Sequence, residues 1–105
     1  STLIYFEKLK SNNGTAGIDR KAKISYVIKT LNEGIVARSQ EGDPFVYNPM
    51  DSGILGGIHF MMKNLAIGES GRAVVPSDHA FGSDGNSKVL GYTPIIIEIE
   101  VLEGA

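Results

Sequence analysis

The sequence predicts an α+β fold in which a curved antiparallel sheet wraps around one short helix. Several segments alternate apolar and polar residues with period two, as half-buried strands do. One segment has the 3-and-4 apolar spacing of an amphipathic helix. The chain has 105 residues, which fits a single domain, residues 1–105. Since nothing else can cover the apolar face of the sheet, we expect the helix to pack against it.

The first half of the chain predicts three strands. Residues 3–10 mix β-branched, aromatic and charged residues, and the turn formers of residues 11–14 end this segment. Residues 23–30 place apolar side chains at every second position. The Asn-Glu-Gly turn of residues 32–34 then leads into residues 35–37, so these two segments are expected to form a hairpin.

The second half predicts two further strands and a long loop. Residues 71–75 form a strand candidate that Pro76 ends, and residues 77–82 are expected to form a brief helical turn. Residues 83–93 are polar and rich in glycine, as loops are. Residues 95–102 give the clearest strand prediction, with Ile95, Ile97, Ile99 and Val101 on one face and Glu98 and Glu100 on the other.

The helix is expected between Asp51 and Gly68. Glycines weaken its first turn, so it is expected to begin near Gly57, with Asp51 or Ser52 as its cap. Its apolar stripe comprises Ile54, Leu55, Ile58, Met61, Met62 and Leu65.

Composition excludes several classes of function. A net charge of −2 and a pI near 5.6 supply no basic surface for a phosphate backbone, so no nucleic-acid partner is expected. The absence of cysteine excludes disulfides, thiol catalysis and cysteine-based zinc sites. Apolar runs such as residues 92–97 are far shorter than the ~20 residues of a membrane helix.

Polar motifs give little sign of acid, base or metal chemistry. Residues 77–79 read Ser-Asp-His, but contiguous side chains diverge and cannot align as a hydrolase triad, so helix capping is the favoured interpretation. His59 and His79 are the only imidazoles, and solvated histidines are favoured over a metal site. No cofactor is expected.

Three weaker patterns also favour ordinary loops. The glycines of residues 53–57 and 68–71 lack the spacing of phosphate-binding loops and are interpreted as turn glycines. The Asp-Gly-Asn of residues 84–86 lacks the ligand spacing of a calcium loop. The Asn-Gly-Thr of residues 13–15 matches a glycosylation acceptor, a pattern with a high chance rate.

An apolar concavity remains as the candidate site. Core packing without any ligand is the alternative interpretation of this set. Its members are Tyr26, Phe45, Tyr47, Ile54, Leu55, Ile58, Phe81 and Ile97.

The order of these residues resembles that of the FKBP-type peptidyl-prolyl isomerase domain. Residues 75–82 read Val-Pro-Ser-Asp-His-Ala-Phe-Gly, similar to the family's Ile-Pro-Pro-Glu-Leu-Ala-Tyr-Gly. Residues 24–26 and 44–47 match its Val-His-Tyr and Pro-Phe-x-Phe positions, with the hairpin glycine Gly34 between them. The resemblance covers nearly the whole chain and implies a five-stranded antiparallel half-barrel around a short helix.

The resemblance also implies an activity and a pocket. The family isomerises X-Pro bonds of polypeptides without a nucleophile, and macrolide-type ligands are expected for the same pocket. By position, the pocket comprises Tyr26, Phe45, Ile54, Leu55, Ile58, Phe81, Leu90 and Ile97.

Several positions depart from the family pattern. Phe81 stands where the family has Tyr, and Tyr92 is considered as a replacement for the lost hydroxyl donor. Ile58 occupies the position of a Trp that forms the pocket floor in the family, and Ile97 occupies the position of a Phe on the pocket wall. Ala37-Arg38 occupies a Phe-Asp pair, and we expect Arg38 to point outward, since an unpaired buried charge is costly.

These departures lead to three hypotheses. The first is an isomerase with weakened or altered activity on proline-containing polypeptides. The second is a non-catalytic chaperone or proline-peptide-binding module, and the third a purely structural domain. The resemblance also implies a bacterial periplasmic or lipid-anchored location, with the targeting segment removed.

Overall fold

The computed structural model describes residues 3–85, 89 and 91–104. The predicted strands are present, and every strand end lies within two residues of its expected place. In chain order the elements are β1 (Tyr5–Lys10), β2 (Ala22–Lys29), β3 (Ile35–Arg38), β4 (Phe45–Tyr47), α1 (Gly56–Lys63), β5 (Ser70–Val75), the 3₁₀ helix η1 (Ser77–His79) and β6 (Ile95–Gly104).

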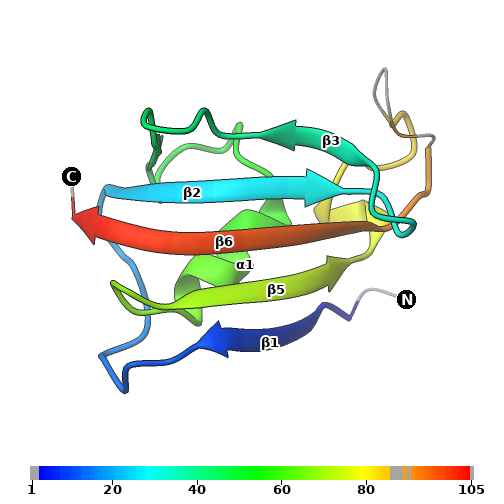
Figure 1. Cartoon of the computed structure of the whole chain (residues 1–105). Helices are drawn as coiled ribbons and strands as arrows, with labels where there is room; N and C mark the ends of the chain where they lie inside the picture. The colour runs from blue at the N-terminus through cyan, green and yellow to red at the C-terminus, as the bar shows by residue number, and fades with distance from the viewer. Residues whose placement is uncertain (1–2, 86–88, 90, 105) are drawn as a thin grey trace.

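The strands form one antiparallel sheet in the order β1-β5-β6-β2-β3, and α1 lies across one face of it (Figure 1). The predicted α+β fold class is therefore confirmed. The sheet has six strands and not the expected five, because β4 pairs with the first half of β2 while β3 pairs with the second half.

Close packing joins the helix to the sheet. Ile58, Met61 and Met62 of α1 are buried. A Cβ atom at Gly57 would lie 2.8 Å from Cγ1 of Val75 and 3.2 Å from Cδ1 of Ile97. Only glycine lets the helix backbone approach β5 and β6 this closely.

The helix begins at Gly56, which confirms the expected start near Gly57, but its cap and its last turn differ from the prediction. Leu55 is the N-cap residue and makes no side-chain capping bond, so the expected cap at Asp51 or Ser52 is wrong. The Asp51 carboxylate instead accepts the Gly53 N–H at 2.8 Å, which makes a turn before the helix. Leu65 is buried as its spacing suggests, but it lies beyond the last helical residue.

Glu69 is a buried carboxylate that the sequence did not single out. Its side chain accepts hydrogen bonds from the Ala66 N–H, the Asn12 N–H and the Ser11 hydroxyl, and its Oε1 lies 3.0 Å from Nζ of Lys8. The Ala66 N–H, together with these other donors, lowers the pKa of Glu69 to about 2. Glu69 therefore fixes the loop after β1 to the turn before β5.

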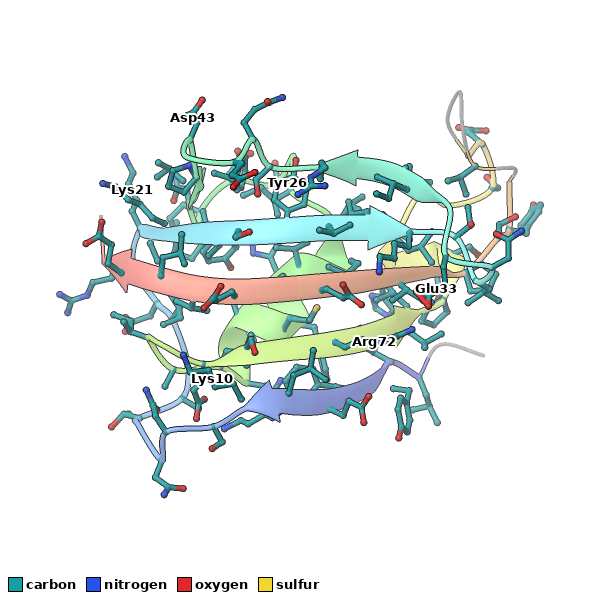
Figure 2. The ribbon with its side chains drawn as sticks, in the orientation of Figure 1. Lys10, Lys21, Tyr26, Glu33, Asp43 and Arg72 are labelled. Carbon is teal, nitrogen blue, oxygen red and sulfur yellow. The ribbon has the colours of Figure 1, made fainter. Side chains whose placement is uncertain are left out.

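The other face of the sheet carries an ion-pair network. Lys29 and Arg72 each lie within 4 Å of both Glu33 and Glu98, and Figure 2 labels Glu33 and Arg72 of this network. Among the residues described, no helix is long and apolar enough to cross a membrane.

Candidate functional site

The described candidate residues belong to one apolar cluster between the sheet and α1. Ile58 and Ile97 are inside it, 5 % and 0 % exposed. Leu90 lies outside the described residues, although its neighbour Val89 is buried in the cluster. The remaining members are half-buried and pack on the surface of the cluster: Tyr26, Phe45, Ile54, Leu55 and Phe81.

Tyr26 and Phe45 form an aromatic pair on neighbouring strands. Phe45 lies opposite Ile24 in the β2–β4 register, so its ring meets that of Tyr26 edge-on, with centroids 5.5 Å apart. Ser39 holds the backbone here: its hydroxyl accepts the Tyr26 N–H, and its own N–H donates to the Tyr26 carbonyl, both at 3.0 Å. Figure 2 shows Tyr26 on the side of β2 that faces the β3–β4 connection.

Ile54 and Leu55 end a tightly turned loop that leads into α1. The loop contains two consecutive turns in which the Asn48 and Asp51 side chains accept the N–H groups two residues later. The Leu55 carbonyl accepts the first helical bonds from Ile58 and His59. No described residue accepts the Leu55 N–H, so this donor is available beside the apolar cluster.

Phe81 is held by the turn that follows η1. The Gly82 N–H donates to the Ser77 carbonyl at 2.7 Å, and the Gly82 carbonyl accepts the Tyr92 N–H at 2.9 Å. Gly82 has a φ of 66°, which glycine adopts without strain. This turn presents the Phe81 ring to the cluster but carries no hydroxyl there.

Tyr92 does not replace that hydroxyl. Its side chain is 78 % exposed and lines a separate groove of about 300 Å³ with Tyr5, Pro76 and Pro94. The suggestion that Tyr92 supplies a donor to the apolar cluster is therefore wrong, because the chain turns it outward.

The Ala37-Arg38 pair divides between the two faces of the sheet. Ala37 pairs with Ile28 and packs against the core. Arg38 pairs with Val27 and is exposed, so the expectation that it points outward is confirmed. The Ala37-Arg38 pair therefore contributes only the Ala37 methyl group to the apolar cluster and places no charge there.

His59 links three elements through its two ring nitrogens. Nδ1 lies 2.6 Å from the Tyr47 Oη, and Nε2 lies 2.9 Å from the Asp51 carbonyl oxygen. A carbonyl can only accept, so Nε2 carries the proton and Nδ1 accepts the Tyr47 hydroxyl. Burial raises the pKa of Tyr47. The expected solvated histidine is wrong here, and no sequence signal connects residues this far apart in the chain.

Polar chemistry elsewhere is sparse. No hydrogen bond joins the side chains of Ser77, Asp78 and His79 in the described structure, and none of them caps η1, so the expected capping role is wrong. No group of three or more metal-ligating side chains occurs within residues 3–85, 89 and 91–104. Asn86, the last residue of the Asp-Gly-Asn motif, is outside that part.

Comparisons with known proteins agree with this geometry at the level of the fold. No protein-family model and no curated protein matches the sequence. A solved peptidyl-prolyl cis-trans isomerase from Pseudomonas syringae superposes with a TM-score of 0.81 at 24 % identity, over 94 % of this chain and 73 % of that one. FkpA from Escherichia coli gives a TM-score of 0.81 at 19 % identity, over 95 % of this chain and 47 % of that one. The chain therefore has the FKBP-like fold, as its sequence resemblance implies.

Proposed function

We propose that the chain is a peptidyl-prolyl cis-trans isomerase that acts on X-Pro bonds of polypeptides. The observation that supports it best is a half-buried aromatic cradle on an FKBP-like fold, with a free backbone donor beside it. This cradle is the set of half-buried rings Tyr26, Phe45 and Phe81: the first two meet edge-on, and all three pack against the same apolar cluster. Leu55 packs there too and supplies the N–H. Macrolide-type ligands are expected to compete with peptides for the same surface.

The chemistry requires no acid, base or metal. The barrier of ~18–20 kcal/mol to rotation about a peptide bond comes from amide resonance. Rotation removes the charge separation of that resonance, so an apolar surface that excludes water favours the twisted bond over the planar one. The Leu55 N–H can hold a carbonyl next to the proline while the ring lies against Phe45.

A second candidate is a proline-peptide-binding module without catalysis. Phe81 lacks the hydroxyl of the family's Tyr, and Tyr92 faces away from the cradle. A surface with the apolar contacts but fewer donors would bind a proline side chain without favouring the twisted bond.

An isomerisation assay separates the two candidates. A chromogenic tetrapeptide with the sequence Ala-Leu-Pro-Phe is cleaved by chymotrypsin only in its trans form, so cleavage reports the isomerisation rate. The isomerase proposal expects the rate to rise linearly with protein concentration, and less with the Phe45→Ala variant. No acceleration at micromolar protein, together with peptide-induced shifts of the Tyr26 and Phe45 resonances, would establish the module instead.

A further inference from the structure

A single described side chain outside the loop before α1 makes a hydrogen bond to it. Within residues 48–54 of the described structure the hydrogen bonds are internal, except that Nε2 of His59 donates to the Asp51 carbonyl. The same carbonyl also accepts the Ile54 N–H at 3.4 Å. Both lone pairs of the Asp51 carbonyl are therefore in use.

This arrangement determines where the helix begins. The apolar spacing extends back to Ile54, and one more helical turn would direct the Leu55 N–H to the carbonyl four residues earlier, which is that of Asp51. His59 already occupies this acceptor, and Leu55 adopts a ψ of 139°, which is not helical. The Leu55 N–H therefore remains without a partner in the described structure, on a residue whose side chain packs against the apolar cluster.

We propose that His59 is a positioning residue of the peptide pocket. In its Nε2–H tautomer it engages the Asp51 carbonyl, prevents α1 from extending by a turn, and keeps the Leu55 N–H available to a substrate carbonyl. The Asp51 carbonyl selects this tautomer, because it can only accept, and the Tyr47 hydroxyl then donates to Nδ1. The inference rests on the proposed function in assigning the Leu55 N–H to a substrate, but the effect of His59 on that N–H is independent of any ligand.

The variant His59→Phe removes both hydrogen bonds and keeps the ring. The Tyr47 and His59 rings meet edge-on with centroids 5.3 Å apart, a contact that Phe preserves. His59 also borders cavities of about 610 Å³ and 470 Å³, so the new ring has room. His79→Phe is the matched control, because that imidazole contacts neither Tyr47 nor Asp51 through a hydrogen bond. His59→Gln retains a donor that can reach the Asp51 carbonyl.

Amide hydrogen exchange of the unliganded protein gives the first readout. In His59→Phe the Asp51 carbonyl is released and α1 can extend, so exchange of the Leu55 amide is expected to slow several-fold, while His79→Phe exchanges as the wild type does. His59→Gln is expected to restore fast exchange. A structural defect alone would speed this exchange, so unchanged or faster exchange in His59→Phe overturns the proposal.

Binding of the Ala-Leu-Pro-Phe peptide gives the second readout. Loss of one available donor is expected to raise Kd about three- to tenfold in His59→Phe, with partial recovery in His59→Gln. If the wild type binds no peptide, the proposed function fails and the exchange comparison alone decides the role of His59. If the wild type binds and His59→Phe binds equally well, the positioning role is overturned.

Discussion

Replacing Phe45 by alanine separates a ligand-binding cradle from ordinary core packing. The Phe45 ring is half-buried and meets Tyr26 edge-on, so part of the ring packs in the core and part of it is exposed. A proline ring that covers roughly 40–60 Å² of that face gains about 1–1.5 kcal/mol. Loss of the edge contact that orients Tyr26 adds about 0.5–1.5 kcal/mol. The sum, about 1.5–3 kcal/mol, corresponds to a Kd increase of about 10- to 150-fold.

Ile58→Ala is the matched comparison, because Ile58 lies beneath the same surface but is only 5 % exposed. Truncation there leaves a cavity and is expected to lower the free energy of unfolding by about 2–5 kcal/mol. It removes almost no surface that a peptide can touch, so Kd is expected to change less than about threefold. The two variants should therefore have opposite profiles: Phe45→Ala loses mainly affinity and Ile58→Ala mainly stability.

Titration of Ala-Leu-Pro-Phe followed by NMR measures Kd, and urea unfolding of the same samples measures stability. Each peptide titration is made without urea, on a variant whose unfolding curve shows that it is folded under those conditions. Equal losses of affinity in the two variants would refute the argument, because they would mean that the aromatic wall contributes no more contact than the buried floor.

Three further predictions concern the framework around the cradle. The pKa of Glu69 is depressed to about 2 from its ordinary 4.5, so its stabilising contribution is present above about pH 4.5 and is lost as pH falls toward 2. Glu69→Gln should therefore unfold more easily than the wild type at pH 7, with the difference shrinking over that acid range in urea titrations. Gly57→Val should lower the free energy of unfolding by about 1–3 kcal/mol through overpacking against Val75; an unchanged urea midpoint would contradict the close contact. Arg38→Ala should leave the free energy of unfolding in urea nearly unchanged, within about 0.5 kcal/mol, since the side chain is exposed; a larger loss would mean that it has a buried partner.

The strands could be predicted because one face of the sheet is buried. Alternation in β6 is regular enough to place its core positions, and β2 shows the same period. β4 could not be predicted in this way, because three residues are too few for a period-two pattern. It exists because it pairs with β2, a contact between distant parts of the chain.

The candidate site was harder to predict than the fold. Tyr26, Phe45 and Phe81 are residue types that cores also use, so composition does not distinguish a cradle from a core. Their placement here came from the family resemblance, and the structure adds that they lie half-exposed around buried Ile58 and Ile97. The two turns of the loop before α1 are local, but the His59 bonds to Tyr47 and Asp51 form only when α1 packs beside β4 and the loop.

The departures from the family pattern fall unevenly on this surface. Ile58 and Ile97 are buried. At these positions an aliphatic side chain excludes water from beneath the cradle, as the aromatic rings of the family would. The loss at Phe81 removes a side-chain donor from the rim, and Tyr92, which is exposed and faces another groove, does not replace it. Under the proposed function, the Leu55 N–H, unpaired in the described structure, is then the backbone donor that would hold a carbonyl beside the twisted prolyl bond. Whether this chain catalyses or only binds should therefore depend more on the loop that exposes Leu55 than on the substituted rings.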